Sequence, residues 1–185
     1  MRVNNVILSK MTQRELKNCI IKDRNTYDSL STPFKRLYAW MCQDRDYYVF
    51  RYIKLLRLSQ FFFEKKKHCK IFYFPYILFK HSKNKLGRQL GIDAGEGPIG
   101  EGLYIAHTGI IIGSAEIGKN CKLHGQNCIG SGSVIGDNCE LWVGAKVIGP
   151  AHLANGITVA AGAVVVNSFD EENITIGGVP ARRIK

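Results

Sequence analysis

Two histidines and a tryptophan in the C-terminal half, His107, His124 and Trp142, are side chains that could take part in chemistry. An imidazole has an ordinary pKa of about 6.5, so it can accept and return a proton near neutral pH. His124 and Trp142 lie 18 residues apart, which we expect to be one full coil of the repeat described below, so their rings should stack. Such an aromatic wall suits a sugar ring or a cofactor, and an ordinary surface histidine is the simpler alternative for His124.

The cysteines form no metal-binding pattern. There are six of them, Cys19, Cys42, Cys69, Cys121, Cys128 and Cys139. Because no Cys-x-x-Cys pair occurs, we expect no metal and a reduced, cytoplasmic protein. Cys121 and Cys139 occupy places of the repeat that hold small residues, which predicts that they pack in the interior.

The net charge of +11 is unevenly distributed along the chain. Residues 1–90 carry 20 Lys and Arg against 6 Asp and Glu, whereas residues 91–185 carry 6 against 9. This asymmetry predicts an anionic partner: a membrane surface, a phosphorylated carrier or, least favoured because no recognition motif is present, nucleic acid. The sequence shows neither a secretory signal pattern nor an apolar run near the roughly 20 residues of a membrane span, so we expect no such segment.

The element that must position these residues is a six-residue repeat over residues 99–170. A fixed period that places one aliphatic residue of each hexad in the interior, here called the plug residue, is typical of a solenoid. In a solenoid, each unit buries its apolar face on its neighbours. Three hexads make one 18-residue coil, so about four coils are predicted. The hexads open on an aliphatic residue twelve times in succession, without a slip in the count: Ile99, Ile105, Ile111, Ile117, Leu123, Ile129, Ile135, Leu141, Val147, Leu153, Val159 and Val165.

A second set of positions, also 18 residues apart, marks one edge of the solenoid. It consists of Gly102, Asn120, Asn138 and Gly156. Gly and Asn tolerate left-handed backbone at a tight corner. The two sets together therefore predict a three-sided prism.

Residues 1–90 show helical patterns instead of the repeat. Thr12 and Glu15 have the spacing of a capping box for a helix to about Arg24, and Thr32-Pro33 predicts a helix to about Cys42. Further helical segments are expected at 45–60 and in the aromatic stretch 68–81. We expect a basic α-helical cap over 1–90 that serves substrate binding and assembly, with attachment to an anionic membrane as the alternative.

Several motifs carry a resemblance to a known family: IGEGLYIAHTG (99–109), IGKNC (117–121), IGDN (135–138), GAKVIG (144–149) and GVPAR (178–182). They resemble the hexapeptide-repeat acetyltransferases, and more narrowly the serine acetyltransferase-like branch found with capsule and exopolysaccharide genes. The resemblance covers about residue 90 to the end. It implies a mainly β fold, a left-handed parallel β-helix of about four coils over 91–170 with an N-terminal α-helical region. The tail, 171–185, would close the CoA groove.

The resemblance also implies catalytic roles for two residues. His107 matches the general base that takes the proton from the acceptor hydroxyl as the hydroxyl attacks the acetyl thioester. Asp93, allowing for a one-residue shift, matches the carboxylate that orients this histidine. A solvated edge histidine and a connector-loop acid are the respective alternatives.

For acetyl-CoA, the resemblance implies a groove between neighbouring prisms of a homotrimer. The matching small residues are Gly144, Ala145, Gly162 and Ala163, which would let the pantetheine reach backbone amides. Arg182 and Arg183 could meet the CoA phosphates. The repeat itself also favours small residues at these places, and a solvated basic tail would explain the arginines equally well.

The sequence departs from serine acetyltransferases at the substrate side. Ala106 stands where they have an aspartate, and residues 129–135 pass into the next hexad without the loop that carries their second histidine and arginine. Asp44 and Asp46 lie roughly where their N-terminal substrate aspartate would be. His124 and Trp142 could substitute for part of the missing groups.

These departures lead to an expected function. We expect an acetyl-CoA-dependent O-acetyltransferase acting on a sugar hydroxyl in surface-polysaccharide biosynthesis, in the cytoplasm or at the inner face of the membrane. A serine O-acetyltransferase of the cysteine-biosynthesis type and a catalytically inactive scaffold are the alternatives.

Overall fold

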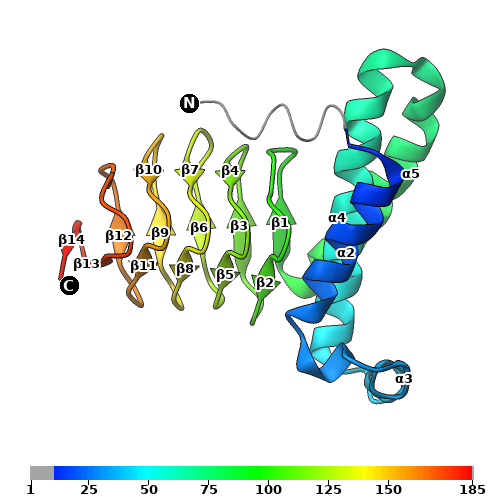
Figure 1. Ribbon diagram of the computed structural model, residues 1–185, viewed down its shortest axis with the longest axis horizontal. Coiled ribbons are helices and arrows are strands. Elements are labelled where there is room, and N and C mark those ends of the chain that lie inside the picture. Colours follow the sequence, from blue (N-terminus) through cyan, green and yellow to red (C-terminus); the bar gives the residue numbers. More distant parts are fainter. Residues whose placement is uncertain (1–10, 185) are drawn as a thin grey trace. The chain divides into compact units, whose positions relative to one another are not determined.

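The computed structural model describes residues 11–184 and divides the chain into two compact units. The helical unit ends at Leu90, and the solenoid unit begins at Gly91. The helical unit consists of α2 (Gln13–Asn25), η1 (Asp28–Leu30), α3 (Pro33–Met41), α4 (Arg45–His68), η2 (Lys70–Phe72) and α5 (Tyr73–Leu90) (Figure 1). Among the described residues, no helix is both long enough and apolar enough to cross a membrane.

The predicted helix starts are confirmed. Thr12 caps α2 in a capping box, in which the Thr12 amide donates to Glu15 Oε2 at 2.6 Å and the Glu15 amide donates to Thr12 Oγ1 at 3.2 Å. Thr32 caps α3 with Pro33 in its first turn. The third and fourth helices are longer than the segments expected, since α4 continues to His68 and α5 to Leu90.

The helical unit is held together mainly by the hairpin of α4 and α5. Phe62 of α4 stacks on Phe79 of α5 with ring centroids 5.3 Å apart. Lys66 Nζ lies 3.8 Å from the centroid of the Tyr76 ring, close enough for a cation–π contact. On the other side of α4, the buried Arg57 guanidinium forms two hydrogen bonds, of 2.8 and 3.0 Å, to Asp23 of α2.

The solenoid unit is a left-handed parallel β-helix of short strands, as predicted. The strands of its five-stranded sheet are β1 (Ile92–Ala94), β3 (Ile110–Ile112), β6 (Cys128–Ile129), β9 (Lys146–Val147) and β12 (Val164–Val165). The three-stranded sheet has β4 (Glu116–Ile117), β7 (Val134–Ile135) and β10 (His152–Leu153). The six-stranded sheet has β2 (Tyr104–Ile105), β5 (Lys122–Leu123), β8 (Glu140–Leu141), β11 (Thr158–Val159), β13 (Thr175–Gly178) and β14 (Ala181–Arg183).

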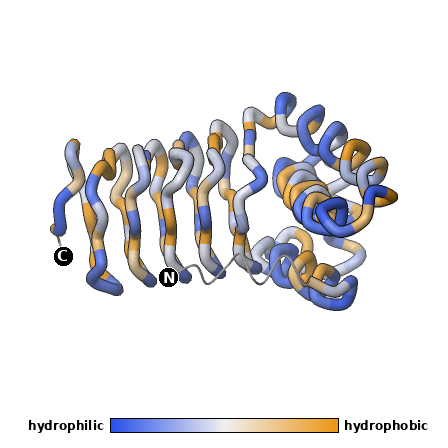
Figure 2. Tube along the Cα trace, turned by 90° about the horizontal axis from the view of Figure 1, so that it is seen from above, coloured by the Kyte–Doolittle hydropathy of each residue, from blue (hydrophilic) through white to orange (hydrophobic). Residues whose placement is uncertain are grey.

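The solenoid has about five turns instead of the four predicted. The hexad count began at Ile99, but β1 already pairs in parallel with β3, and Ile92 lies opposite Ile110. Ile92 and Ala94 are both buried, so they fill a first rung that lacks the six-residue period. Figure 2 shows hydrophobic positions recurring from one coil to the next.

The predicted corner positions are confirmed by the backbone. Gly102, Asn120, Asn138 and Gly156 have φ of +80°, +54°, +58° and +70°. The side-chain Nδ2 of Asn120 donates to Asn138 Oδ1 in the next coil at 3.2 Å. A Cβ at Gly102 would collide with the side-chain oxygen of Asn120, so this ladder of side chains needs glycine at its first rung.

The uninterrupted hexad register is wrong at one place, directly after His107. Ile111 is 55% exposed, whereas Ile112 is buried and lies opposite Ile129, a plug residue. The plug therefore falls seven residues after Ile105 and five before Ile117. The additional residue is accommodated at Gly109, where the amides of Gly109 and Ile110 both donate to the Gly91 carbonyl at 3.0 Å.

Candidate active site

His107 lies on the outside of the solenoid, where the chain leaves β2 and turns toward β3. The preceding side chains of Ile105 and Ala106 are buried, whereas His107 is exposed. Gly125, one coil further along, lies against His107, because a Cβ added at Gly125 would come within 2.7 Å of the Cβ of His107. The repeat thus presents an imidazole at the surface on a backbone that neighbouring coils support.

The backbone beneath His107 is held by Asn127. We call residues 124–127 the corner loop; in it, Gly125 has φ of +117° and Gln126 of +53°. Asn127 is 1% exposed. Its side chain accepts from the Gly125 amide at 2.9 Å and donates to the carbonyls of Trp142 at 2.8 Å and Ala145 at 3.2 Å. This role was not predicted, although a polar residue at an interior place of the repeat was the available signal.

His124, at the start of the corner loop, forms a cluster with Glu140 and Trp142 on the outer face of the six-stranded sheet. The His124 ring stacks on the Trp142 ring with centroids 4.6 Å apart and planes 4° apart, as their 18-residue spacing predicts. His124 Nε2 lies 2.6 Å from Glu140 Oε1. Glu140 was not among the predicted residues, although it starts β8 directly opposite Lys122, two residues before His124.

Asp93 and His107 are not brought together. Asp93 is exposed on β1, opposite Ile111 in the five-stranded sheet, whereas His107 follows a strand of the six-stranded sheet. In residues 11–184, no hydrogen bond or ion pair joins the two side chains. The orienting role expected for Asp93 therefore has no support in the geometry of the chain.

The four small residues expected at the CoA groove fall into two kinds. Ala145 and Ala163 are buried at 0% and 1% exposure and fill the interior of the coils. Gly144 and Gly162 lie at the surface, where a Cβ on Gly144 would touch Gly162 at an ordinary 3.7 Å and one on Gly162 would meet nothing within 4 Å. The outer side of these two glycines is thus open to a narrow chain such as pantetheine.

The backbone amides of these four residues are already engaged. Gly144 donates to the Gly125 carbonyl and Gly162 to the Val143 carbonyl, each at 2.9 Å. The amides of Ala145 and Ala163 donate to Trp142 and Ala160. The coil turns therefore already use the N–H donors of all four residues.

The two arginines of the tail differ in their surroundings. Arg183 Nη1 forms an ion pair with Glu171 Oε2 at 2.7 Å. Arg182 is exposed on β14, opposite Gly177 of β13, and has no ion pair within the described range 11–184. Of the two, Arg182 is the one available to a phosphate.

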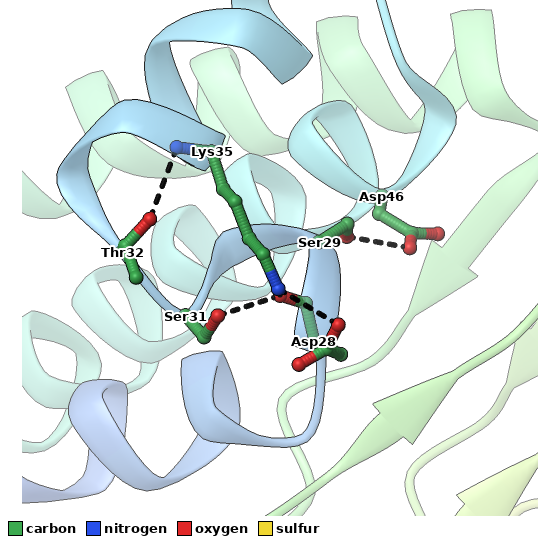
Figure 3. Close-up of polar contacts among 6 residues, drawn as sticks. All are labelled: Asp28, Ser29, Ser31, Thr32, Lys35 and Asp46. Atoms are coloured by element: carbon green, nitrogen blue, oxygen red, sulfur yellow. Dashed lines mark hydrogen bonds and ion pairs between the residues drawn. The ribbon is translucent and has the colours of Figure 1, made fainter.

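Asp44 and Asp46 have structural partners in the helical unit. Asp44 caps α4, where its side chain accepts from the Asp46 amide at 3.0 Å. The Asp46 carboxylate accepts from Ser29 Oγ at 2.8 Å (Figure 3) and from Arg45 Nη2 at 2.9 Å. Both carboxylates therefore stabilise the start of α4, a role that was not predicted for them. Within residues 11–184, no group of three or more His, Cys, Asp and Glu side chains could hold a metal ion.

Comparison with curated proteins finds a serine acetyltransferase. No protein-family model matches the chain. The serine acetyltransferase of Buchnera aphidicola subsp. Schizaphis graminum is 28% identical over 148 residues, which cover 74% of this chain and 53% of that protein. The chain thus spans about half the length of the curated relative that it matches.

Solved structures of serine acetyltransferases resemble the whole chain. Soybean serine acetyltransferase in complex with serine matches with a TM-score of 0.73 at 21% identity, over 93% of this chain and 70% of that one. The Vibrio cholerae O1 biovar El Tor enzyme gives 0.72 at 18%, over 92% and 66%. A serine acetyltransferase in complex with CoA gives 0.72 at 19%, over 95% and 72%. These likenesses establish the fold.

The comparisons also correct the expected function. A sugar O-acetyltransferase of surface-polysaccharide biosynthesis was expected from Ala106 and the missing loop, but the relative and the structures found are serine acetyltransferases. None of those named here is a polysaccharide enzyme. The local departures at the substrate side therefore do not identify a sugar acceptor.

Proposed function

We propose that the protein is an acetyl-CoA-dependent O-acetyltransferase and that its acceptor is the hydroxyl of L-serine. The observation that carries the proposal is an exposed histidine, His107, at a coil corner of a solenoid whose sequence and fold resemble serine acetyltransferases. A soybean enzyme of this fold was solved with serine and another enzyme with CoA, which supports both substrates.

In the proposed reaction, His107 acts as the general base. Its imidazole takes the proton of the serine hydroxyl while the hydroxyl oxygen attacks the thioester carbonyl carbon. The tetrahedral centre then collapses with loss of the C–S bond, and the imidazolium returns the proton to the departing sulfur. The products are O-acetylserine and free CoA, and no metal takes part.

Acetyl-CoA would bind along the open side of Gly144 and Gly162. The missing side chains leave space there, and the 3.7 Å approach between Gly162 and a Cβ built on Gly144 indicates a continuous strip of bare backbone. Arg182 is the cation that could face a CoA phosphate. We further propose a cytoplasmic C3 trimer, since a groove between identical prisms would enclose this strip.

Release of free thiol from acetyl-CoA tests the proposal directly. We expect thiol to appear only when L-serine is added, and His107→Asn to lower kcat by at least about 100-fold. His152→Asn is the matched control, because His152 is also exposed but pairs with Asp170 on the three-stranded sheet. Full activity of His107→Asn would refute the mechanism. Absence of thiol release with every acceptor tested would favour an inactive scaffold.

A further inference from the structure

The proposed reaction does not use the His124–Glu140–Trp142 cluster. Its three side chains come from two neighbouring coils, since β5 and β8 pair in parallel with Leu123 opposite Leu141. His124 and Trp142 therefore occupy equivalent places one coil apart. Their nearly parallel rings form a fixed stack, which holds the imidazole in one plane.

The polar groups of the cluster are paired but remain accessible. The side chains of His124 and Glu140 are 21% and 26% exposed, and Trp142 is 44% exposed. When its imidazole is protonated, His124 donates from Nε2 to Glu140 Oε1 and has a second N–H at Nδ1, while the carboxylate retains Oε2. In that form, a cation and an anion lie side by side at the surface, each with hydrogen-bonding capacity left.

This pair lies next to the proposed general base. Gly125 follows His124 directly, so their Cα atoms are about 3.8 Å apart, and Gly125 lies against His107. Asn127 fixes the backbone of the corner loop between them. A small acceptor with its hydroxyl at His107 could therefore extend over the corner loop toward His124 and Glu140.

We propose that His124 and Glu140 bind the charged groups of an α-amino acid acceptor, with Trp142 as the wall behind them. The inference rests on the proposed function and adds the residues that recognise the acceptor. A zwitterion complements the protonated imidazole and the carboxylate: its carboxylate accepts from His124 Nδ1–H, and its ammonium donates to Glu140 Oε2. An uncharged acceptor offers neither of these charges.

Two variants separate the two contacts. Glu140→Gln keeps the shape of the side chain but removes its charge, and we expect KM for L-serine to rise about 10- to 100-fold while KM for acetyl-CoA stays unchanged. His124→Phe keeps the ring stack on Trp142 but removes both nitrogens, and a similar rise is expected. Glu101→Gln is the control, because Glu101 lies 3.7 Å from Lys119 in a different contact.

Acceptor analogues identify which charge each residue binds. 3-Hydroxypropionate lacks the ammonium and ethanolamine lacks the carboxylate. The preference of the wild type for L-serine over 3-hydroxypropionate should fall in Glu140→Gln, and its preference for L-serine over ethanolamine should fall in His124→Phe. NMR signals of the His124 imidazole should shift when L-serine is added to the wild type without acetyl-CoA.

The outcomes distinguish this inference from the proposed function. If the wild type acetylates L-serine while both variants keep its KM and analogue preferences, the inference is wrong and the proposed function stands. If the wild type neither acetylates L-serine nor shows the His124 shift, both are wrong. Raised KM values for L-serine, together with the reduced analogue preferences predicted for each variant, would support the assignment.

Discussion

Gly125 lies so close to His107 that a Cβ at Gly125 would come within 2.7 Å of the Cβ of His107. This contact and φ of +117° both exclude a side chain. Gly125→Ala should therefore displace His107 and lower kcat by at least about 10-fold, because small misplacements of a catalytic group are costly. Steady-state kinetics with acetyl-CoA and L-serine measure the effect.

The control for that variant is Gly149→Ala. Gly149 also has a positive φ, +79°, but a Cβ there would meet nothing within 4 Å. Gly149→Ala should keep kcat while lowering the free energy of unfolding, because alanine is strained at positive φ. Equal losses of kcat in both variants would mean that the contact with His107 is irrelevant.

Asn127→Leu should destabilise the solenoid unit. The substitution leaves the Gly125 amide and the carbonyls of Trp142 and Ala145 without the buried side chain that satisfies them. We expect a loss of about 2–4 kcal/mol in the free energy of unfolding, measured by urea denaturation. Asn155→Ala removes an exposed asparagine that also bonds across coils, and should cost about 1 kcal/mol or less.

The buried ion pair between Asp23 and Arg57 should be costly to break from one side. Their side chains are 0% and 3% exposed, so Asp23→Leu leaves a buried guanidinium without this carboxylate. We expect a loss of about 3–5 kcal/mol, much of it recovered in the double variant Asp23→Leu with Arg57→Met. A double-mutant cycle by urea denaturation measures the coupling, and strictly additive losses would contradict it.

The thiols should differ sharply in reactivity. The hydrogen bond with Cys139 and burial raise the pKa of the Cys121 thiol, which keeps it protonated and unreactive at neutral pH. Cys42 and Cys69 are exposed. Mass spectrometry after brief alkylation of the native protein should find Cys42 and Cys69 modified and Cys121 unmodified. Modification of Cys121 at the same rate would show that the coil opens readily.

The hairpin tip, residues 65–78, should bind anionic membranes. It exposes Ile71 and Phe74 at 75% and 76%, next to four lysines of which Lys67 pairs with Glu64. Apolar side chains surrounded by lysines suit an anionic lipid surface, whereas two copies of this tip would repel each other. The double variant Ile71→Ser, Phe74→Ser should lose binding to phosphatidylserine vesicles at low salt in a sedimentation assay.

Phe34→Ser provides the control for membrane binding. Phe34 is equally exposed, at 77%, but belongs to α3. It should bind the vesicles as the wild type does. Failure of the wild type to sediment with the vesicles would exclude membrane attachment and favour the alternative, a helical cap.

Local sequence signals predicted much of the fold, because they act within a few residues. Thr12 with Glu15 and the positions of Gly102 and Asn120 each follow from backbone hydrogen bonding or φ preference, and each is confirmed. Ile111 was assigned wrongly because the run Ile110-Ile111-Ile112 offers three equivalent plugs. Only the pairing of β3 with its neighbours on both sides decides which of them faces inward.

The candidate site was less predictable, since its parts depend on contacts between coils. The stack of His124 on Trp142 followed from their spacing, but Glu140 bends toward His124 from the neighbouring coil. Asn127 was not predicted as part of the site, although its hydrogen bonds span two turns. Asp93 was matched along the sequence with an assumed shift, and that shift places it on a different sheet from His107.

The additional residue at Gly109 is compensated within the same coil, because the next interval between interior aliphatic residues is one residue shorter. Successive interior aliphatic residues are seven residues apart from Ile105 to Ile112 and five apart from Ile112 to Ile117. Leu123 therefore again lies opposite Ile105. The corner of His107 can therefore differ in shape from every later corner without shifting any of the coils that follow. One corner of the solenoid thereby has its own backbone geometry, while the later coils keep the regular six-residue period.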